Sequence, residues 1–195
     1  MSIRRGFIRC VFAAAAVAAL SGMLSHAQTL GEPEEFTAIA IKNNNLGSGA
    51  GTVLIKVTRW STEAERSRLL QALKTKGQDK LLDELQGMKS VGTIRTPDSL
   101  AYDLRYAHQQ PGEDGGSQIV LATDRPIGFW EATNRPRTIQ YPFTVIQMQM
   151  GRDGTGKGTL SYATKIVARK NVIELEDFAT QPIMLTDIRS KKADR

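Results

Sequence analysis

Most of the chain after residue 90 alternates between apolar and polar positions with a period of two, which is typical of strands with one buried face. Two earlier segments are also alternating or β-branched, and the Asn- and Gly-rich residues between them favour a hairpin loop. The strands predicted by these patterns are 36–42, 52–59, 91–95, 100–108, 118–123, 143–150, 159–169, 172–177 and 183–188.

A helical period replaces the strand period between the second and third of these segments. Ser61 is placed to accept hydrogen bonds from the first amides of a helix, and Glu63 and Glu65 suit its positive end. The predicted helix runs to about Lys76, where Gly77 interrupts it. In the second stretch, the apolar residues on one face are Leu81, Leu82, Leu85 and Met88. The pattern fits either a helical hairpin or one kinked helix, lying against the sheet.

Together these elements predict an α+β fold, mostly β, in a single domain over residues 28–188. About nine short antiparallel strands, separated by turns rich in Gly, Pro, Asn and Asp, are typical of a β-barrel or a β-sandwich. We expect a helical hairpin to be inserted after the second strand.

The first residues are typical of an export leader. Basic residues at positions 4, 5 and 9 precede an apolar run, and Ser25-His26-Ala27 has small residues where a signal peptidase reads them. We therefore expect a signal peptide over residues 1–27, cleaved near Ala27, and a periplasmic or extracellular protein. The apolar run is about half of the roughly 20 residues that a membrane-spanning helix needs, so no transmembrane segment is expected.

The segment from Arg4 to Arg9, Arg-Arg-Gly-Phe-Ile-Arg, resembles the twin-arginine export signature. Ile3 stands where that signature usually has Ser or Thr. The resemblance implies export of the folded protein, while the general secretory route stays open as the alternative.

Charge is concentrated at the two ends of the chain. The formal net charge of +6 falls to +3 without the leader, and residues 28–188 carry no net charge. The remaining excess lies in residues 189–195, which we predict to be a disordered basic tail that contacts an anionic surface weakly and can be deleted without loss of the fold. A neutral domain gives no reason to expect nucleic-acid binding.

Several chemistries are excluded by residue types that are missing. The only cysteine is Cys10, in the leader, and His108 is the only histidine after it. Disulfides, thiol catalysis and multi-histidine metal sites are therefore not available. We expect no metal and no cofactor.

Residues 151–159 pass through the spacing of a phosphate-binding loop. Gly158 stands where that loop needs Ser or Thr for magnesium, and the following residues alternate like a strand rather than opening a helix. The sequence favours a hairpin loop here.

The candidate binding site comes from the alternation in the strand predicted over 100–108. Tyr102, Tyr106 and His108 fall on one face with Leu100 and Leu104, and Tyr162 of a later strand is placed to join them. Aromatic walls with a few polar tips are typical of a small-ligand cavity in a barrel mouth. The alternative is that the tyrosines are core residues and that His108 is exposed at a strand end.

A second candidate is the long segment between residues 124 and 142, which has little periodicity. Its aromatic and basic residues, Phe129, Trp130, Arg135 and Arg137, have the composition of an interaction loop. Alternatively, Phe129 and Trp130 plug one end of the barrel.

These observations favour an exported, non-catalytic binding or envelope-associated module that holds a small amphipathic molecule in a barrel mouth. Its partner would be that molecule or an envelope protein. Two alternatives remain. One is a hydrolase or isomerase that uses His108 as a base with Asp103 or another carboxylate nearby, and the other is a structural protein-interaction module.

Overall fold

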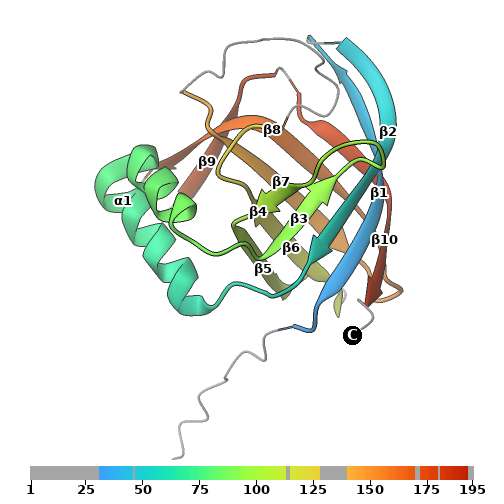
Figure 1. The fold of residues 1–195 in the computed structure, drawn as a ribbon, viewed down its shortest axis with the longest axis horizontal. Helices are drawn as coiled ribbons and strands as arrows, with labels where there is room; N and C mark the ends of the chain where they lie inside the picture. Colours follow the sequence, from blue (N-terminus) through green and yellow to red (C-terminus); the bar gives the residue numbers. More distant parts are fainter. Residues whose placement is uncertain are drawn as a thin grey trace, which may run out of the picture.

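The computed structural model describes residues 31–45, 47–112, 115–127, 140–169, 172–179 and 181–192. Within them, antiparallel strands form a single sheet that curls into a nearly closed barrel, with one helix outside it (Figure 1). The elements are β1 (Glu34–Asn44), β2 (Gly47–Val57), α1 (Glu63–Gln86), β3 (Gly92–Arg95), β4 (Tyr102–Leu104), β5 (Tyr106–Pro111), β6 (Ser117–Ala122), β7 (Phe143–Met150), β8 (Thr155–Arg169), β9 (Val172–Asp177) and β10 (Ile183–Lys192).

The order of the strands explains how the barrel closes. Around the sheet they run β4-β3-β2-β1-β10-β8-β7-β6-β5, and β9 pairs with β8. The first and last members, β4 and β5, are consecutive in the chain and are joined by Arg105. Leu104 accepts a backbone hydrogen bond from Val91 beside β3, whereas Arg105 donates one to Ala122 of β6. The predicted strand 100–108 is therefore two strands, and the residue between them closes the barrel.

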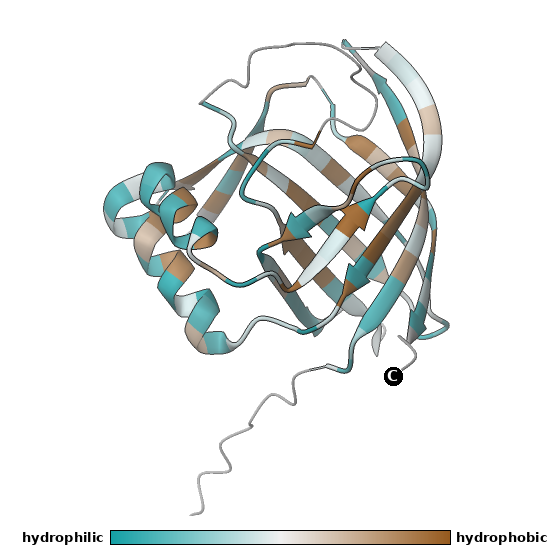
Figure 2. Ribbon diagram, in the orientation of Figure 1, coloured by the Kyte–Doolittle hydropathy of each residue, from teal (hydrophilic) through white to brown (hydrophobic). Residues whose placement is uncertain are grey.

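Apolar side chains fill the barrel interior. The largest fully buried ones there include Phe36, Ile55, Leu104, Ile146 and Leu160, each at most 1% exposed. Trp60, which follows β2, is also buried in this cluster, and its indole Nε1 donates to the carbonyl oxygen of Glu32 at 2.9 Å. A second apolar cluster lies between α1 and the outside of the sheet, and Figure 2 shows apolar residues on both elements.

The predicted alternatives were a helical hairpin and one kinked helix, and the structure has one sharply bent helix. Gly77, inside α1, has φ 74° and ψ −165°, which no helix interior allows. The Nε of Arg68 lies 3.3 Å from a carboxylate oxygen of Glu84 across this bend, whereas a straight helix would separate the two residues by about 24 Å. Of the helices in the described ranges, none is long and apolar enough to cross a membrane.

The segment with phosphate-loop spacing is the turn between β7 and β8. Gly151 donates its amide to the carbonyl of Thr155 at 2.7 Å, and Gly154 has φ 76°, so the chain reverses within a few residues. The carboxylate of Asp153 accepts from the amide and the hydroxyl of Thr155. The next residues form β8 rather than a helix. The prediction of a hairpin loop is confirmed.

The predicted disordered tail is wrong for residues 189–192, which continue β10. They pair with β1, and Lys191 and Lys192 lie opposite Glu35 and Glu34 in the register. The amide of Ser190 also donates to the carbonyl of Gly154 at 2.8 Å. The opposite charges of Lys191 and Glu35 at facing positions favour this pairing, so basic composition alone did not indicate disorder. Residues 193–195 lie outside the described residues.

Truncating the chain after Ile188 is expected to destabilise the protein, contrary to the sequence-based expectation. The truncation removes the end of β10 and leaves the first residues of β1 without that partner strand. Losing a few backbone hydrogen bonds costs about 2 kcal/mol or more. Urea denaturation of the full and truncated chains measures the difference, and an unchanged midpoint would show that this pairing adds no stability.

Candidate functional site

A groove lies outside the barrel, between α1 and the outer face of five strands, β5 to β9. Its volume is about 280 Å³. The lining is apolar along most of its length and polar at one end. The apolar residues come from both α1 and the sheet, and they are Leu69, Leu70, Leu73, Leu81, Leu85, Val120, Ala122, Val145, Ile166, Ile173 and Leu175.

The floor of the groove follows from strand alternation and register. In β5, Ala107 points into the barrel core, so Tyr106 and His108 on either side of it point outward. The register places Tyr106 beside Ala122, and Ala122 beside Val145. A second row runs from His108 through Val120 to Gln147 in the same way.

The wall of the groove is held in place where α1 begins. The amide of Ser61 donates to the carbonyl of Ala107 at 2.7 Å, and the hydroxyl of Ser61 accepts from the amide of Ala107 at 3.1 Å. The helix cap is Thr62 rather than the predicted Ser61, and it forms a capping box with Glu65. These contacts fix the first turn of α1 directly beside β5.

Glu65 ties the same turn to the end of β2. Its two carboxylate oxygens each accept a hydrogen bond of 3.0 Å from the guanidinium of Arg59. These bonds, together with the Thr62 amide bond, lower the pKa of Glu65. The first turn of α1, from which the helix continues as the wall of the groove, is therefore held by hydrogen bonds to Arg59 and Thr62.

Among the described residues at the polar end of the groove, one carries a formal charge. The residues at this end are Arg66, Tyr106, His108, Gln110 and Gln147. One guanidinium nitrogen of Arg66 is bound to the exposed carboxylate of Glu63 at 2.9 Å. The rings of Tyr106 and His108 stack with centroids 6.1 Å apart and an angle of 17° between their planes. Burial raises the pKa of Tyr106 to about 12, so its phenol stays neutral.

The predicted four-residue site is divided between two places. Tyr106 and His108 line the groove, whereas Tyr162 belongs to the barrel interior and Tyr102 packs against that interior cluster. Both Leu104 and Ala107 point inward, so the alternation is interrupted at Arg105, where the chain changes partner strand. The expectation that Tyr102, Tyr106 and His108 share one face is therefore wrong.

A buried cation accompanies Tyr162 inside the barrel. Lys42, on β1, is only 8% exposed, and its ammonium nitrogen lies 6.0 Å from the centre of the Tyr162 ring. That distance is within the range of a cation–π contact. The strand pattern predicts Lys42 at the end of a strand and indicates no role for it.

No protein-family model, curated protein or solved structure matches this chain. The groove therefore has to be interpreted from its own residues.

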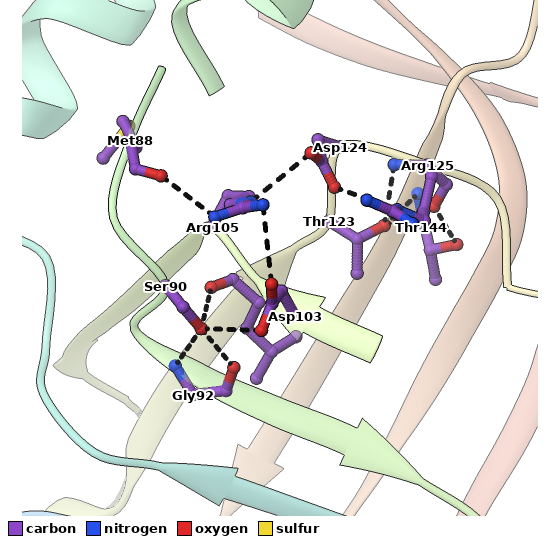
Figure 3. Close-up of polar contacts among 10 residues, drawn as sticks. Met88, Ser90, Gly92, Asp103, Arg105, Thr123, Asp124, Arg125 and Thr144 are labelled. Atoms are coloured by element: carbon purple, nitrogen blue, oxygen red, sulfur yellow. Dashed lines mark hydrogen bonds and ion pairs between the residues drawn. The ribbon is translucent and has the colours of Figure 1, made fainter. Parts of the chain in front are cut away.

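A polar network lies where β4 ends and β5 begins, which we call the seam of the barrel (Figure 3). Arg105 is its centre: it donates to the carbonyl of Met88 at 3.1 Å and contacts the carboxylates of Asp103 and Asp124 at 3.5 and 3.4 Å. The Asp124 side chain is 6% exposed and also lies 3.4 Å from Arg125. These contacts link β4, which contains Asp103, to the end of β6, which precedes Asp124. They indicate that the network has a structural role.

Asp103, one of the carboxylates predicted to assist His108, lies elsewhere. It accepts a hydrogen bond from the hydroxyl of Ser90 and pairs with Arg105 at the seam. The charges that act on the imidazole of His108 are those of Arg66 and Glu63 on α1. Among the described residues, no cluster of three His, Cys, Asp or Glu side chains could hold a metal ion.

The predicted interaction loop lies outside the described residues, since Phe129, Trp130, Arg135 and Arg137 fall in the range 128–139. Sequence reasoning missed Arg66 and the leucines of α1 as lining residues, because their spacing indicates only that one helix face packs against something. The Ser61–Ala107 contact, which aligns that face with β5, has no sequence signal.

His108 is expected to make stability depend on pH below neutrality. Burial, and then the charge of Arg66, lower the pKa of His108 below its usual 6.5. The unfolded chain therefore binds more protons than the folded chain as the pH falls through 6.5, and stability decreases. In a chain beginning at Gln28, the only histidine is His108, so His108→Gln should remove this part of the pH dependence. NMR titration of the imidazole checks the cause directly, and a pKa at or above 6.5 would contradict it.

Proposed function

We propose that this protein is an exported, non-catalytic binding module that holds a small amphipathic molecule in the groove between α1 and the barrel. The observation that carries the proposal is the lining of that groove, which has apolar side chains along its length and polar groups at one end. Such a combination is typical of small-molecule sites. Its volume of about 280 Å³ suits a small ligand rather than a protein segment.

Two further features support binding at this place rather than in the barrel mouth. The barrel interior is filled with side chains that are nearly inaccessible, including Ile146 and Leu160. The groove is bounded by elements tied together by hydrogen bonds at the Ser61–Ala107 contact. Because this wall is already held in place, ligand binding costs less conformational entropy.

Export is proposed from the leader alone. The basic start, the apolar run and the small residues before position 28 carry it. Replacing both Arg4 and Arg5 by Lys should abolish export if the twin-arginine route is used, with the precursor accumulating in the cytoplasm. Unchanged export of that variant would assign the protein to the general secretory route.

The proposed binding can be tested by filling the groove. Val120 is half-buried in the floor, and Val120→Phe should occupy part of the space and weaken binding of 8-anilinonaphthalene-1-sulfonate in a fluorescence titration. Ile39→Phe is the matched control, because Ile39 is 43% exposed on β1 and does not line the groove. Equal probe binding by both variants and the parent chain would contradict the proposal.

A further inference from the structure

The charge of the groove points to the chemical class of its ligand. Among the described residues that line the groove, Arg66 is the one with a formal charge, and none is a carboxylate. The other polar members are neutral: two amides, from Gln110 and Gln147, and the stacked rings of Tyr106 and His108. A cation and amide donors at one end of an apolar groove are complementary to an anion with an apolar tail.

The position of Arg66 makes its guanidinium available to such an anion. Arg66 lies in the first turns of α1, and its side chain is 38% exposed. Glu63 engages one of its terminal nitrogens, Nη1, at 2.9 Å, and the phenol of Tyr106 is a second hydrogen-bond partner of the guanidinium. Guanidinium groups present several donors in a planar fork and bind carboxylates through two of them. A ligand carboxylate would therefore bind Arg66 at the same time as Glu63 does.

We infer that the groove binds an anionic amphiphile, with its head group on Arg66 beside the Tyr106–His108 pair and its apolar tail along the leucines of α1. This inference rests on the proposed function, and it adds the sign of the head group and its contact residue. The tail contacts Leu69, Leu73 and Val120, among the residues that α1 and β6 bring together.

The test compares three probes that share one tail: decanoate, decanol and decyltrimethylammonium, each below the concentration at which it forms micelles. Isothermal titration of the chain from Gln28 should give the tightest binding for decanoate, about tenfold tighter than for decanol, and the weakest for the cation. Arg66→Gln should reduce decanoate binding to the level of decanol. Arg68→Gln is the matched control, because Arg68 lies on the same helix, pairs with Glu84 and does not line the groove.

A third variant tests the sharing of Arg66. Glu63→Gln removes the competing carboxylate and should strengthen decanoate binding by about two- to threefold while leaving decanol binding unchanged. Equal affinities for the three probes, or equal loss in the Arg66 and Arg68 variants, would overturn the anionic assignment and leave the groove as a binding site. Absence of binding by any of the three probes and by the fluorescent sulfonate would instead overturn the proposed function itself.

Discussion

Replacing Gly92 with alanine is expected to lower the free energy of unfolding by about 3 kcal/mol or more. Gly92 begins β3 and pairs with Val57 of β2 on one side and Leu104 of β4 on the other. A Cβ atom at this position would lie 2.0 Å from the carbonyl oxygen of Lys56 and 3.0 Å from the Cα of Val57. Both neighbours are backbone atoms, so the pairing of β2 with β3 would have to open.

A second glycine provides the control for this prediction. Gly49 lies in β2, where an added Cβ meets no atom within 4 Å. Gly49→Ala should be neutral or slightly stabilising, because alanine reduces the entropy of the unfolded chain. Urea denaturation of the two variants compares them directly. A Gly92→Ala variant as stable as Gly49→Ala would show that β2 and β3 are not paired in this register.

Replacing Arg105 with methionine is expected to cost about 2 to 4 kcal/mol, because it removes the more buried of the two arginines that contact the buried carboxylate of Asp124. The Asp124 side chain is 6% exposed, and the Arg105 side chain is 18% exposed. The substitution also removes the hydrogen bond to the carbonyl of Met88. These contacts join the end of the α1 region to the seam between β4 and β6, so the loss should affect closure of the barrel.

Two companion variants separate the charge from the packing. Arg125 also contacts Asp124, but its side chain is 49% exposed, so Arg125→Met should cost less than about 1 kcal/mol. Adding Asp124→Asn to Arg105→Met removes the buried charge that has lost one of its two arginine partners, and should recover part of the lost stability. If Arg105→Met and Arg125→Met have the same free energy of unfolding, the seam does not depend on a buried ion pair.

The positions of the strands could be predicted because each one carries its own signal. Alternation with period two and turn residues locate β1 to β3 and β6 to β10 within a few residues of their actual ends. The break between β4 and β5 carries no such signal, since Arg105 simply continues the alternation. The inward and outward alternation of side chains breaks at a residue where the chain changes its partner strand. Arg105 is such a residue, and its partner strands depend on how the whole sheet curls.

For the same reason, only two of the four residues predicted for the candidate site lie together in the groove. Tyr106 and His108 were recognised because they share one face of a short segment, and they do line the groove. Tyr102 and Tyr162 were joined to them by assuming an unbroken strand, and they lie in the barrel instead. Arg66 could not be chosen from sequence, because its contact with the groove depends on where α1 docks.

The basic C-terminal segment shows a limit of reading charge along the chain. Lys191 and Lys192 look like part of a solvated tail when only their neighbours in sequence are considered. In the fold they face Glu35 and Glu34, which are more than 150 residues away in the chain. Local composition contains no information about that partner.

Native mass spectrometry of the protein purified from the cells in which it is made would test most directly whether the groove is a ligand site. We expect the parent chain and the Ile39→Phe variant to carry a small molecule that is lost on denaturation, and the Val120→Phe variant to carry little or none. A parent chain whose native mass equals its denatured mass, or the same bound mass in the Val120→Phe variant, would contradict ligand binding in the groove between α1 and the barrel.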